Sequence, residues 1–122
     1  MLGPVTPADL EAVVRDALTG DDRAAHATYA RAEVVPGGTS VEVAGHLLGA
    51  PDDFLVAFVD ESPGGNWAHA CRYLVATGDG VVATPAGWPP AMGPLPAPWH
   101  LLYRGRSVED WQLLPLAAPA DR

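Results

Sequence analysis

The stretch FLVAFV, from Phe54 to Val59, is apolar at every position, and it decides the fold. A strand with one solvated face alternates apolar and polar residues, whereas a strand covered on both faces is apolar throughout. We therefore predict that residues 54–59 form a central strand of a sheet, with other elements packed on both of its faces.

The sequence around this strand predicts a mainly antiparallel sheet. Residues 70–77 and 81–84 flank an Asp-Gly turn, which is typical of a β-hairpin. We expect a half-buried strand over 41–47 with Gly45 as a possible bulge, and two short strands over 99–103 and 111–114. The six prolines of residues 85–98 exclude a helix or a central strand, so we expect this segment to wrap the surface.

Helices are predicted before the strands. Thr6 can cap a helix that has Pro7 in its first position, and apolar residues then follow at helical spacing until Gly20. A second, alanine-rich helix is expected to start at Asp21 or Asp22 and to run to about Glu33. This order predicts one α+β domain over residues 1–122, in which an N-terminal helix pair packs on a mainly antiparallel sheet of four to six short strands.

Composition narrows the classes of partner. The formal net charge is −8, and all seven basic residues are arginines, so nucleic acid and anionic membranes are not expected as partners. The lack of lysine, with abundant Ala, Gly, Pro and Arg, indicates GC-rich coding, which is typical of many bacteria. One cysteine and the lack of a signal peptide or apolar span predict a cytoplasmic protein.

The loop between the predicted strands concentrates reactive side chains. In an extended segment His69, Cys71 and Tyr73 share one face, and a histidine beside a thiol can stabilise the thiolate. One hypothesis is therefore a small enzyme or ligand-binding protein with a pocket between helices and sheet. Cys71 would be its nucleophile, His69 its base, and Asp60 the acid that orients the imidazole. A buried, purely structural Cys71 is the competing interpretation.

No cofactor or metal site is predicted, because the four histidines form no pair at ligand spacing with each other or with Cys71. Tryptophans flank the two longest loops, and tryptophan is enriched at protein interfaces. Our first hypothesis is therefore an acidic module that binds a protein partner, with a basic protein as one candidate. The module would act as an assembly component or as an inhibitor or immunity-type protein. A homo-oligomer is a further possibility. The expected contact residues are Asp60, Glu61, Trp67, His69, Arg72 and Trp88.

Overall fold

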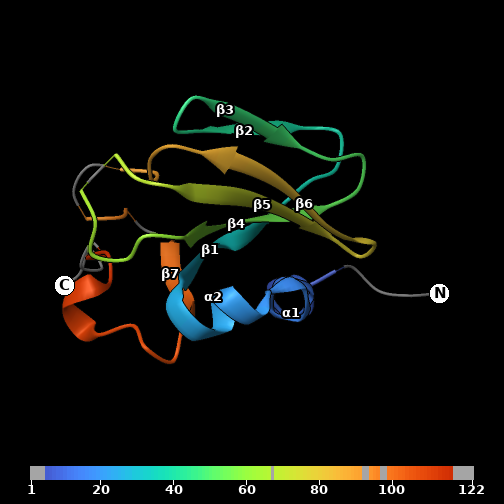
Figure 1. Ribbon diagram of the computed structural model, residues 1–122. Helices are drawn as coiled ribbons and strands as arrows, with labels where there is room; N and C mark the ends of the chain where they lie inside the picture. Colours follow the sequence, from blue (N-terminus) through green and yellow to red (C-terminus); the bar gives the residue numbers. More distant parts are fainter. Residues whose placement is uncertain (1–4, 67, 92–93, 97–98, 117–122) are drawn as a thin grey trace, which may run out of the picture.

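The computed structural model describes residues 5–66, 68–91, 94–96 and 99–116 (Figure 1). Its main sheet has five strands in the order β6-β5-β4-β1-β7, with every neighbouring pair antiparallel. Two helices lie on one side of this sheet and a separate β2–β3 hairpin on the other, so the predicted α+β class is confirmed. The elements are α1 (Pro7–Ala17), α2 (Gly20–Ala25), β1 (Ala27–Val35), β2 (Ser40–Val43), β3 (His46–Gly49), β4 (Phe54–Asp60), β5 (Cys71–Thr77), β6 (Gly80–Ala86), β7 (Trp99–Arg104) and a 3₁₀ helix η1 (Asp110–Gln112).

β4 is the central strand, as its apolar sequence predicts. All of its residues are buried, and alternate side chains enter two different cores. Phe58 packs with Tyr29, Tyr73 and Trp99 on the hairpin side, whereas Leu55, Ala57 and Val59 meet the helices on the other side. A strand with two covered faces has no position left for a polar side chain until it ends at Asp60.

α1 begins where the sequence predicts. Thr6 and Asp9 form a reciprocal capping box, in which each side chain accepts a hydrogen bond from the other residue's backbone N–H. Leu10, Val14 and Leu18 then lie on the sheet. Neither helix of the described chain is long and apolar enough to cross a membrane.

The predicted second helix is wrong in extent. α2 is capped by Thr19, not by Asp21 or Asp22, and it ends at Ala25, after which the chain enters β1. β1 lies between β4 and β7, and Tyr29 stacks on Phe58 with ring centroids 5.0 Å apart. Pairing on both edges and this burial outweigh the helix preference of the alanines, which is small in energy beside tertiary contacts.

Two predicted strands are also wrong. Residues 40–49 form a hairpin rather than one bulged strand, because Ala44 and Gly45 both have positive φ angles, of 52° and 83°. This is the signature of a tight two-residue turn whose twist matches the flanking strands. Residues 110–112 form η1 rather than a strand, since the Gln112 side chain caps the Glu109 N–H and Trp111 is 70% exposed.

Candidate functional site

The end of β4, the loop that follows it and the start of β5 meet helix α2, and most of the predicted site residues gather there. Cys71 and Tyr73 face the hairpin-side core, so the intervening Arg72 points to the helix side. Its guanidinium binds Glu61 Oε2 at 2.7 Å and also binds the Asp22 carboxylate. Arg72 therefore joins the loop to α2.

Asp22 is the member of this cluster that the sequence analysis missed. Its side chain is fully buried, and it binds Arg72, His26 Nδ1 at 2.8 Å and the Thr19 N–H at 2.9 Å. Burial raises the pKa of Asp22, but the hydrogen bonds from Arg72, His26 and Thr19 outweigh it and lower the pKa to about 2. The signal in the sequence is the spacing of Thr19 and Asp22, which is that of a capping box.

Asp60 and His69 are brought together, as the enzyme hypothesis requires. His69 Nε2 lies 2.8 Å from Asp60 Oδ1, and both side chains are buried. The Nδ1–H donates to the carbonyl of Asn66, while Asp60 Oδ1 accepts the Ser62 N–H at 3.0 Å. Apart from this close contact, neither His69 Nε2 nor Asp60 Oδ2 has a hydrogen-bond partner among the described residues. Burial raises the pKa of Asp60 despite the attraction of His69.

Cys71 lies in the hairpin-side core. Its thiol is buried and donates to the carbonyl of Trp88 at 3.1 Å. Burial, together with the nearby carboxylates of Asp60 and Glu61, raises the pKa of the thiol to about 12. These surroundings disfavour the thiolate that a nucleophile needs.

Trp88 follows β6 and is 45% exposed. Its carbonyl accepts two hydrogen bonds, one from Cys71 Sγ and one from the hydroxyl of Tyr73 at 3.0 Å. An open groove of about 620 Å³ lies beside it, lined by Ala44, Gly45, His46, Pro85, Ala86, Gly87 and Trp88. Trp67, which was predicted to contribute to the same surface, lies outside the described residues.

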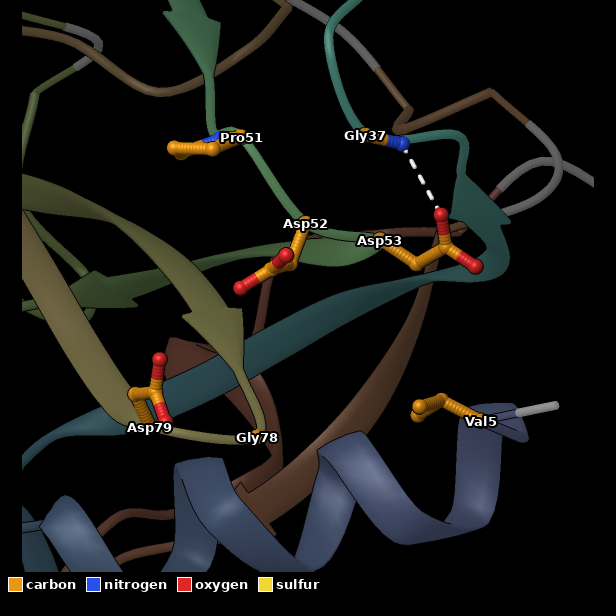
Figure 2. A pocket seen from close by; sticks show the side chains of 7 residues that line it. All are labelled: Val5, Gly37, Pro51, Asp52, Asp53, Gly78 and Asp79. Carbon is orange, nitrogen blue, oxygen red and sulfur yellow. Dashed lines mark hydrogen bonds between the residues drawn. The ribbon is translucent and has the colours of Figure 1, made fainter. Parts of the chain in front are cut away.

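A second hollow, of about 500 Å³, lies where the β5–β6 turn approaches the segment before β4 (Figure 2). Its acidic residues are Asp52, Asp53 and Asp79, and Asp53 accepts the Gly37 N–H at 2.9 Å. Within the described part of the chain, no three His, Cys, Asp or Glu side chains are arranged to hold a metal ion. This hollow therefore adds negative charge to the surface.

Comparison with known proteins gives no match to a family model, to a curated protein or to a solved structure.

We expect the Asp60→Asn variant to be more stable than the wild type at pH 8, by about 1–2 kcal/mol, because the amide removes a poorly paired buried charge. The pKa of Asp60 is higher in the folded than in the unfolded chain. The free energy of unfolding of the wild type therefore falls as the pH rises above the pKa that Asp60 has in the unfolded chain. The Asp60→Asn variant lacks this pH dependence. Urea unfolding of both proteins from pH 4 to pH 8 measures the difference.

Asp22→Asn is the matched control for this prediction, because the pKa of Asp22 is lowered rather than raised. It is expected to destabilise the protein at pH 8. If Asp60→Asn destabilises the protein in the same way, the contact with His69 stabilises the fold and the prediction is wrong.

Proposed function

We propose that this chain is a small acidic binding module that acts through a protein partner, with Trp88 and its groove as the centre of contact. The observation that carries the proposal is that the indole of Trp88 is half-exposed while its backbone is held by hydrogen bonds from the core. The Trp88 carbonyl is held by two buried donors, Cys71 and Tyr73, while the side chain reaches the surface. An aromatic anchor on an ordered backbone loses little entropy on binding.

The groove suits a protein surface better than a small ligand. Its described lining is mostly apolar and small, and among those residues His46 is the only titratable one. Sites for small molecules enclose most of the ligand and place several polar groups to orient it. An open groove with an adjacent tryptophan instead accommodates an apolar side chain from a partner.

The charge of the chain supports a basic partner. The net charge is −8, and Asp52, Asp53 and Asp79 gather in one hollow. Negative potential of this kind accelerates encounter with a basic protein, and it does so less at high salt. The proposal places this encounter in the cytoplasm, where a lone reduced thiol such as Cys71 persists.

The other predicted contact residues take supporting positions in this proposal. Asp60 and His69 are buried below the loop and shape it, and Arg72 holds the loop to α2. Glu61 is partly exposed and pairs with Arg72. The alternative, an enzyme with Cys71 as nucleophile, is supported by the Asp60–His69 contact and opposed by the high pKa of the thiol.

To test the proposal, a photo-crosslinking amino acid is incorporated in place of Trp88 in the cells that produce the protein. We expect a discrete adduct with one protein, formed in lower yield as the salt concentration of the lysate is raised before irradiation. The same substitution at Trp111 is the matched control, because Trp111 is more exposed but lies away from the groove. Equal adducts from both positions, or none from position 88, would contradict the proposal.

A further inference from the structure

The strand β6 forms one edge of the main sheet and carries no charged residue along Gly80–Ala86. Val82 in its middle is 70% exposed. Edge strands usually carry charges that prevent pairing with another chain. The opposite edge strand, β7, does carry charge, since Arg104 forms an ion pair with Asp110, and its His100 contacts Glu11. β6 is thus the edge of this sheet that is open to another strand.

The register of the β5–β6 hairpin determines which backbone groups of β6 are available. Its ladder starts at the pair Thr77–Gly80, which closes the two-residue turn, so alternate residues from Gly80 onward bond to β5. Val81, Ala83 and Pro85 therefore direct their backbone groups outward. No hydrogen bond links the N–H of Val81 or Ala83 to another part of the described chain. Pro85 has no N–H, so the outward row of donors stops at Ala83.

We infer that β6 pairs with β6 of a second copy of this chain, antiparallel and about a two-fold axis at Val82. In this register Val81 of each copy exchanges two hydrogen bonds with Ala83 of the other. All the available donors and acceptors of both residues are then used. The two Val82 side chains meet at the axis as a close, non-hydrogen-bonded pair, which buries the exposed valine.

Pro85 favours this register over the one whose two-fold axis passes through Ala83. If the axis passed through Ala83, the outward carbonyl of Val81 would face Pro85 of the other copy, which has no N–H to donate. Pairing about Val82 makes no demand on Pro85 as a donor. The dimer is closed by symmetry, because each copy uses the β6 edge of its main sheet. This inference is independent of the Trp88 contact, which lies beyond the end of the strand.

A cysteine at the axis tests the register directly. Cross-strand cysteines in a non-hydrogen-bonded pair have Cα atoms about 4.5 Å apart, within the range of a disulfide. We expect Val82→Cys to form a covalent dimer under mild oxidation. Thr84→Cys lies on the same face two residues further along, where the two copies are too far apart, and it is expected to form no disulfide-linked dimer. The native Cys71 is buried and common to both variants.

Light scattering provides the second measurement. The mass of the wild type is expected to rise toward that of a dimer between about 10 µM and about 1 mM, a range suited to a small edge interface. Ala83→Pro removes an outward N–H without touching the β5 ladder and is expected to stay monomeric. A wild type that is monomeric throughout, or equal disulfide formation at positions 82 and 84, would overturn the inference. Growth of the mass beyond a dimer would overturn the two-fold closure.

Discussion

Replacing Arg72 with methionine is expected to lower the free energy of unfolding by about 3–5 kcal/mol at neutral pH. The guanidinium is the main partner of Asp22, whose carboxylate is fully buried beneath α2. Methionine keeps most of the volume of the arginine but leaves the buried charge with only His26 and the Thr19 N–H. The cost arises from the stranded carboxylate rather than from the lost ion pair, and chemical denaturation measures it.

The pH dependence separates this explanation from simple loss of packing. The pKa of Asp22 is lowered to about 2 in the folded chain, from a usual value of 3.8. Its contribution to stability is therefore complete above about pH 4 and is lost as the pH falls toward 2. The gap between the wild type and Arg72→Met should close over the same interval, because the carboxyl becomes neutral in both proteins.

Two further variants make the test specific. Adding Asp22→Asn to Arg72→Met removes the stranded charge and should recover part of the lost stability. Arg104→Met is the matched control, because the ion pair between Arg104 and Asp110 is largely exposed and is expected to contribute less than about 1 kcal/mol. Equal losses from Arg72→Met and Arg104→Met would show that Asp22 is not held by a buried ion pair.

The elements that sequence reasoning predicted are those whose side chains alone reveal their burial. β4 is apolar at six successive positions, the β5–β6 hairpin has an Asp-Gly turn, and α1 has a capping box followed by an apolar stripe. β1 was missed because its burial comes from partners on both edges, and these are distant in sequence. Its alanines predict a helix from local propensity, whereas pairing with the two neighbouring strands determines that the segment is a strand.

In the candidate site, too, the sequence predicts some contacts and not others. The alternation of strand residues grouped His69, Cys71 and Tyr73 on one face. Cys71 and Tyr73 do share it and both donate to the Trp88 carbonyl, whereas His69 lies before β5 and contacts Asp60. The contact between Asp60 and His69 also follows from their positions at the adjoining ends of one loop. Asp22 could not be foreseen as a partner of Arg72, because fifty residues separate them and the α2 packing alone unites them. Local patterns predict which way a side chain faces, but not what covers it.

The reaction of Cys71 with iodoacetamide at pH 8 is expected to be about 1,000-fold slower than that of an unhindered thiol. The pKa of Cys71 is raised from 9.0 to about 12, so the thiolate fraction falls by about this factor. Burial and the hydrogen bond to the Trp88 carbonyl restrict access as well. Mass spectrometry at timed intervals measures the rate, and the single thiol leaves no ambiguity of site.

The same chain in urea is the internal control and should react at the rate of an ordinary cysteine. His69→Ala distinguishes the two hypotheses for the site. If His69 activated the thiol, its removal would slow alkylation, whereas a buried structural thiol reacts at an unchanged rate, or faster if the loop loosens. Rapid alkylation of the folded wild type near pH 7, abolished by His69→Ala, would contradict the structural role of Cys71. It would make the enzyme hypothesis the better account of the Asp60–His69 pair, since a thiolate beside two carboxylates persists only where an imidazolium compensates it.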